Sequence, residues 1–245
     1  MISDASEALD IPVIGSLNGV TNAGWIDYAK KIQDAGAKAL ELNVYAVATD
    51  LDESSVEVEQ RYLDVLTAVK ASVDIPVAMK LSPYFSSVAN MSKRLVEAGV
   101  DGLVLFNRFY QPDYDLDALQ VTADLNLSTA NEIRLPLLWI AVLKNRLETS
   151  LAATTGVETH LEVLKYLMAG ADVTMTASSL ITKGPGYVTT LIDGMTRWME
   201  EREYESVEQL KGSMSQSAVA DPSTFERANY IKILEKNKAE YTLAG

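Results

Sequence analysis

Three polar side chains interrupt otherwise apolar segments that read as β-strands. In ALELNV, Glu41 and Asn43 fall on one face of the predicted strand, and in VAMKLS the same alternation isolates Lys80. A carboxylate, an amide and an ammonium group can together bind and orient a polar small molecule. Taken singly, Lys80 could simply extend to solvent and Asn43 could cap a turn. Their position on one face of consecutive strands favours a functional site.

A second set of residues could hold an anion. The segment after one predicted strand contains Thr155 and Gly156, and the segment after the next contains Ala177 and Ser178, each just before a helix. Small residues let backbone N–H groups approach an anion, and the N-terminal end of a helix is partly positive. Tight turns use the same residues, but their occurrence after both of the last two strands indicates a phosphate site.

The elements that position these residues alternate between strand and helix. Apolar residues three and four apart predict helices, and short β-branched or apolar runs predict strands. The candidate strands are 12–17, 38–44, 76–82, 102–107, 150–155 and 172–177. Continuous apolar strands separated by helices predict a parallel sheet, as in a TIM (β/α)8-type barrel or a doubly wound sheet. In a barrel, the polar residues would point inward at the rim where barrel enzymes place their sites.

The chain reads as one barrel-type domain over residues 1–245. Residues 108–132 are too polar and too long for an ordinary loop, so we expect an excursion over the mouth of the barrel. Residues 221–245 form a predicted helical tail, in which Asp221-Pro222 opens a helix that runs to about Lys238.

Composition narrows the function. A net charge of -13 argues against nucleic acid and anionic membrane surfaces, and favours a small-molecule ligand. The absence of cysteine excludes disulfides, thiolate metal sites and cysteine nucleophiles. The single histidine, His160, lies beside apolar helix residues, so no catalytic or metal site is assigned to it. No apolar run approaches the roughly 18 residues of a membrane span, and we expect a cytoplasmic protein.

Several motifs, taken in order, resemble one family. The segments are ALELNVY, PVAMKLSPY, GLVLFNRF, TTGVETHLEVLKYLMAGADVTMTASSLITKGPG and YESVEQLKG, with LFNRFYQPD and GSMSQ…DPSTFERANY in support. Together they resemble the dihydroorotate dehydrogenase superfamily of FMN-dependent barrels, and within it the dihydroorotate dehydrogenase-like branch. The resemblance covers nearly the whole chain.

The resemblance implies roles for individual residues. It matches Lys80 to a lysine beside the flavin, where positive charge stabilises reduced FMN. It matches Asn43 and Asn107 to asparagines that bind the pyrimidine substrate or the flavin. Further matches are Asn18 for the substrate, and Gly156, Ala177 and Ser178 for the FMN phosphate. The implied activity is oxidation of a dihydropyrimidine such as dihydroorotate in pyrimidine biosynthesis. The assembly that should be tested is a homodimer.

Two departures from the family pattern put catalysis in question. The family's Cys or Ser base corresponds to Ala46, and an expected asparagine corresponds to Ala48; alanine cannot accept a proton. Residues 12–17 match the third strand of the family, so the resemblance implies a barrel that lacks its first two βα units at the N-terminus.

Three hypotheses follow from the sequence. The first is an FMN-dependent oxidoreductase, and the second is a barrel of the same family that has lost catalysis. In the third, Lys80 forms a Schiff base in a phosphate-binding aldolase.

Overall fold

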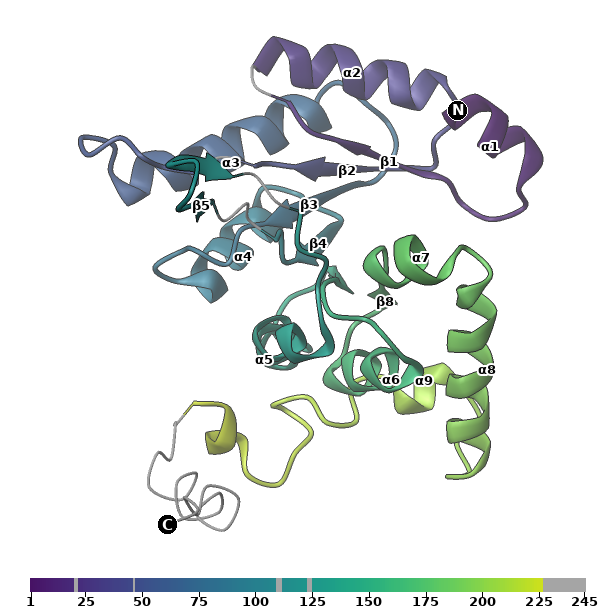
Figure 1. Cartoon of the computed structure of the whole chain (residues 1–245). Coiled ribbons are helices and arrows are strands. Elements are labelled where there is room, and N and C mark those ends of the chain that lie inside the picture. The colour runs from purple at the N-terminus through teal and green to yellow at the C-terminus, as the bar shows by residue number, and fades with distance from the viewer. Residues whose placement is uncertain (20–21, 46, 109–111, 123–124, 227–245) are drawn as a thin grey trace, which may run out of the picture.

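The computed structural model describes residues 1–19, 22–45, 47–108, 112–122 and 125–226 (Figure 1). Six parallel strands form one sheet in the order β1-β2-β3-β4-β7-β8. Their bounds are β1 Ile14–Leu17, β2 Ala39–Asn43, β3 Val77–Leu81, β4 Gly102–Leu105, β7 Ser150–Ala153 and β8 Val173–Thr174. The sheet curls into a half-barrel with helices along its outside, so the prediction of an incomplete TIM-type barrel with six parallel strands is confirmed.

Helices follow the strands as the apolar periodicity predicts. Their bounds are α2 Asn22–Asp34, α3 Ser55–Lys70, α4 Val88–Glu97, α5 Arg134–Leu143, α6 His160–Ala169, α7 Ser178–Lys183, α8 Tyr187–Glu200 and α9 Val207–Leu210. The sequence reading missed one more helix, α1 Ile2–Ala8, which has no buried residue and thus no apolar stripe to reveal it.

Strand alternation divides the sheet into two faces. Leu40, Leu42 and Met79 are fully buried in the core beneath the helices. The residues between them, Glu41, Asn43 and Lys80, share the opposite face, and Asn43 is the register partner of Lys80. The helix-covered core therefore lies on one side of the sheet, and the polar residues lie on its inner, concave side.

The sequence Ala-Gly-x-Asp occurs at 98–101 and at 169–172, each time between the end of a helix and the start of a strand. Gly170 closes α6 with a φ of 120°, which favours glycine, as expected for that position. Two residues later, Asp172 accepts a hydrogen bond of 2.9 Å from the Leu151 N–H on the neighbouring strand. Asp172 also forms ion pairs with Lys144 and Lys211. The phrase thus ties each helix end to the start of the adjacent strand.

The long excursion contains short regular elements. An antiparallel hairpin pairs β5 Asp113–Asp115 with β6 Gln120–Thr122, and the 3₁₀ helix η1 Ala130–Ile133 leads into α5. Of the predicted C-terminal helix, the described part contains the 3₁₀ helix η2 Pro222–Phe225, which Asp221 caps. Residues 227–245, which include the rest of that prediction, lie outside the described residues.

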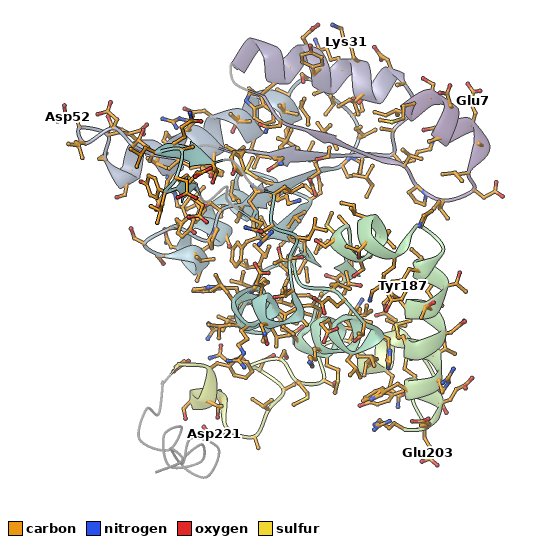
Figure 2. The ribbon with its side chains drawn as sticks, viewed as in Figure 1. Glu7, Lys31, Asp52, Tyr187, Glu203 and Asp221 are labelled. Atoms are coloured by element: carbon orange, nitrogen blue, oxygen red, sulfur yellow. The ribbon has the colours of Figure 1, made fainter. Side chains whose placement is uncertain are left out.

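Several charged side chains lie at the periphery of the fold. In Figure 2, Glu7, Lys31, Asp52 and Glu203 project from the outer edge of the molecule.

Over the described ranges, no group of three His, Asp or Glu side chains has a metal-binding arrangement. The helices of the described residues are all too short or too polar to cross a membrane.

Candidate functional site

A largely buried ion pair holds Lys80 at the floor of the site. Lys80 on β3 places its Nζ 3.7 Å from Glu41 Oε1 on β2, and the two side chains are only 18% and 7% exposed. The Ser16 hydroxyl on β1 donates a 2.7 Å hydrogen bond to the same carboxylate oxygen. Glu41 therefore has partners on both strands that neighbour β2. Its carboxylate holds Lys80, which lines the cavity at the concave face.

Two asparagines beside this ion pair have unsatisfied polar atoms. Asn43 ends β2, and Asn107 follows β4, where its backbone N–H donates to the Leu81 carbonyl at 2.7 Å. Among the described residues, the buried Asn43 Oδ1 and Asn107 Nδ2 atoms have no hydrogen-bond partner. An unpaired buried polar atom costs about 1–3 kcal/mol. These two atoms are therefore suited to a ligand that supplies the missing partners.

The loop after β7 has an unusual backbone. Thr155 and Gly156 have φ values of 85° and 73°, so two consecutive residues lie in the region that favours glycine. For a β-branched residue such as threonine this conformation is strained. The Tyr166 hydroxyl donates to the Thr155 carbonyl at 2.8 Å and holds the loop from α6. Strain of this kind is typical of functional loops.

One cavity of about 270 Å³ brings these groups together. Its lining consists of residues at or just after the C-terminal ends of β2, β3, β4, β7 and β8, together with two residues of the excursion, Arg108 and Ser128. They are Asn43, Tyr45, Lys80, Phe106, Asn107, Arg108, Ser128, Thr154, Thr155, Gly156, Val157, Met175, Thr176, Ala177 and Ser178. Five of the predicted cofactor residues and two of the three predicted substrate residues therefore surround a single cavity.

A second cavity of about 330 Å³ adjoins the first. The two share Phe106, Asn107, Arg108 and Thr155. Arg108 Nε lies 2.8 Å from Glu132 Oε1. Burial opposes ionisation of Glu132, but hydrogen bonds from the Thr129 N–H and from Arg108 lower the pKa of its carboxyl. Arg108 is thus held by a charged partner between the two cavities.

Other predicted residues lie elsewhere. Asn18 follows β1, is exposed, and does not line the cavity. Ala48 is exposed, and Ala46, at the position of the family's base, lies outside the described residues. His160 begins α6 against Gly194 of α8, where an added Cβ would meet its ring at 2.5 Å. This helix contact gives His160 a packing role away from the cavity.

The sequence reading missed Phe106, Arg108 and Ser128. Ser128 comes from a polar segment without periodicity, so no pattern assigned it to a strand or a face. One signal was present: Thr129 and Glu132 form a capping box before η1. That motif marks the end of the excursion, and therefore the point at which the chain returns to the sheet.

Comparison with known proteins identifies the family. The family model described as dihydroorotate dehydrogenase matches residues 2–199. The chain belongs to the dihydroorotate dehydrogenase family. It is 26% identical to a putative dihydroorotate dehydrogenase A (fumarate) of Aeropyrum pernix over 220 residues, which cover 86% of this chain and 70% of that protein.

Two relatives belong to another type within the family. The chain is 24% identical over 211 residues to a dihydroorotate dehydrogenase B (NAD(+)) catalytic subunit of Thermoplasma acidophilum, covering 82% of this chain and 68% of the relative. It is 25% identical over 206 residues to the corresponding subunit of Methanocaldococcus jannaschii, covering 82% and 66%. The six-stranded half-barrel and its concave site thus belong to a chain of the dihydroorotate dehydrogenase family.

Proposed function

We propose that the chain binds FMN and a dihydropyrimidine-type ligand in the cavity and acts as an FMN-dependent oxidoreductase of the dihydroorotate dehydrogenase type. The observation that carries the proposal is the convergence of Lys80, Asn43 and Asn107 on one cavity, where both amides have an unpaired buried atom. A flavin or pyrimidine ring offers carbonyl and N–H groups that can satisfy these atoms.

The chain's residues suit such a ligand. When bound, FMN supplies a hydride acceptor. The Lys80 ammonium, which Glu41 holds, would add positive charge beside a bound ring and so favour its electron-rich reduced form. Asn43 and Asn107, from the strands on either side of Lys80, would orient ring N–H and carbonyl groups. The Gly156 backbone, with Ala177 and Ser178 across the cavity, is the proposed phosphate cradle.

Flavin binding tests this proposal directly. The purified chain is titrated with FMN while flavin absorbance and fluorescence are recorded, and the bound protein is then mixed anaerobically with dihydroorotate. We expect saturable binding, followed by bleaching of the flavin band. Replacing Asn107 with Ala should weaken binding, because its buried amide then makes no bond to the ligand. A chain that binds no flavin would contradict the proposal.

A second candidate is a family member that binds the same ligands without turnover. Ala46 favours it, because proton removal from the substrate needs a base at that position. This candidate predicts normal FMN binding with no bleaching by dihydroorotate. The two candidates therefore differ in one measurement on the same sample.

The Schiff-base hypothesis finds less support in the geometry. A Schiff base forms from a neutral amine, whereas the Lys80 ammonium is engaged by Glu41 at 3.7 Å. Borohydride treatment with a carbonyl substrate should leave Lys80 unmodified. The cytoplasmic location, the lack of a nucleic-acid partner and the homodimer remain predictions from sequence.

A further inference from the structure

The proposed phosphate cradle is filled by a side chain of the excursion. The Gly156 N–H donates a 3.1 Å hydrogen bond to the Ser128 hydroxyl. The Ser128 and Ser178 hydroxyls lie 2.9 Å apart, and the Ser128 N–H donates to Ser178 Oγ at 3.2 Å. Ser128 thus connects the loop after β7 to the loop after β8, directly between the two sets of cradle residues.

We propose that Ser128 is a latch: its hydroxyl occupies the place of an anion oxygen, and a phosphorylated ligand must displace it. The proposal rests on the proposed function, because it assigns the ligand's phosphate to this cradle. Ser128 therefore lowers the affinity of the cavity for phosphorylated ligands and leaves its affinity for unphosphorylated ligands unchanged.

The phosphate must displace the Ser128 hydroxyl because both need the same hydrogen-bond donor. The buried Gly156 N–H is a single donor, and Ser128 Oγ occupies its acceptor position. A phosphate oxygen needs the same position at about 2.7–2.9 Å, so the two oxygens exclude each other. An anionic oxygen accepts a stronger hydrogen bond than a neutral hydroxyl, and the exchange therefore favours the ligand. Ser178, released from Ser128, can then donate to the phosphate.

The surrounding backbone allows the side chain to turn while the excursion stays in place. Thr129 and Glu132 form a capping box immediately after Ser128, and Glu132 is bonded to Arg108. At Gly156 an added Cβ would lie 2.7 Å from the Thr129 carbonyl oxygen, so the two loops are in close backbone contact. Rotation about the Ser128 Cα–Cβ bond suffices to free the Gly156 N–H, while the backbone that follows Ser128 stays anchored.

The first test uses inorganic phosphate, so that it does not depend on flavin binding. The Gly156 amide resonance is followed by NMR while phosphate is added to the wild type, to Ser128→Ala and to Ser213→Ala. Ser213 is exposed and lies outside both cavities, which makes it the matched control. We expect phosphate to bind Ser128→Ala about fivefold more tightly than the other two, as the loss of one competing hydrogen bond implies.

Two further readouts complete the test. Without ligand, the Gly156 amide should exchange with solvent faster in Ser128→Ala, while amides of β3 keep their protection and show that the fold is intact. FMN should bind the variant about fivefold more tightly, with riboflavin unchanged. Equal or weaker phosphate binding by Ser128→Ala, or no saturable response of Gly156 in any protein, overturns the latch. Loss of flavin binding alone contradicts the proposed function and leaves the phosphate test decisive.

Discussion

Lys80 and Glu41 face each other across adjacent strands, with Nζ 3.7 Å from Oε1, and Lys80 lines a cavity together with two asparagines that each have an unpaired amide atom. Because both side chains are largely withdrawn from solvent, each changes the electrostatic potential felt by a ligand above them. Lys80 adds positive charge, and Glu41 partly cancels it. The pair therefore sets the charge of the site as a unit.

Opposite redox effects are expected from the two members of this pair. Lys80→Met should lower the midpoint potential of bound FMN by about 30 mV, equivalent to about 1.4 kcal/mol lost from the reduced form. Glu41→Gln should raise the potential, because Lys80 is then uncompensated. Spectroelectrochemical titration measures both. A shift of the same sign in the two variants would show that the ion pair does not act on the flavin.

A base restored at residue 46 should increase turnover. The resemblance places the proton acceptor at Ala46, so Ala46→Ser or Ala46→Cys should speed anaerobic bleaching of bound FMN by dihydroorotate by about 100-fold or more. Ala48→Ser is the control, because it adds a hydroxyl two residues away. If Ala46→Ser binds flavin and substrate yet reacts no faster than the wild type, residue 46 does not limit catalysis.

Two-residue periodicity explains why part of the site was predictable. Glu41, Asn43 and Lys80 lie on strands whose alternate residues are fully buried, and the inward orientation of all three was correct. Asn107, Gly156, Ala177 and Ser178 follow strands directly, so the topology alone brings them to one rim. Such residues need only the strand positions and the parallel order.

The remaining residues depend on contacts that no local pattern encodes. Ser128 reaches the cavity across a separation of 28 residues from Gly156. Asn18 also follows a strand, but it lies at β1, the edge of the sheet away from β7 and β8. Position after a strand is therefore insufficient; the strand must also be one of those whose C-terminal ends surround the cavity, namely β2, β3, β4, β7 and β8.

Thr155 offers a stability test of the cradle. With a φ of 85°, its β-branched side chain is strained, and Thr155→Gly should increase the free energy of unfolding by about 1 kcal/mol. Thr154 has no such backbone, and Thr154→Gly should instead lower the free energy of unfolding by about 1 kcal/mol. Urea denaturation compares the two. Destabilisation by Thr155→Gly would mean that the side chain makes a compensating contact.

Asp172 predicts a pH-dependent contribution to stability at the N-terminal ends of the strands, away from the cavity. Burial opposes its ionisation, but the Leu151 N–H and the Lys211 and Lys144 ammonium groups lower the pKa of its carboxyl. Asp172→Asn keeps an acceptor for Leu151 and loses both ion pairs, so it should cost about 1–2 kcal/mol of unfolding free energy at pH 7. Asp193→Asn, on the exposed side of α8, should cost little.

The sign of the pH effect follows from the direction of this shift. A carboxyl whose folded-state pKa lies below its unfolded value stabilises the fold fully above the unfolded pKa, near about 3.9, and loses that contribution as pH falls through the folded value. The difference between wild type and Asp172→Asn should therefore stay constant from pH 7 to about pH 5 and shrink below about pH 4. Urea unfolding across this range measures it. A difference that persists unchanged in acid would assign the loss to packing, because the carboxyl's charge is then absent from both proteins.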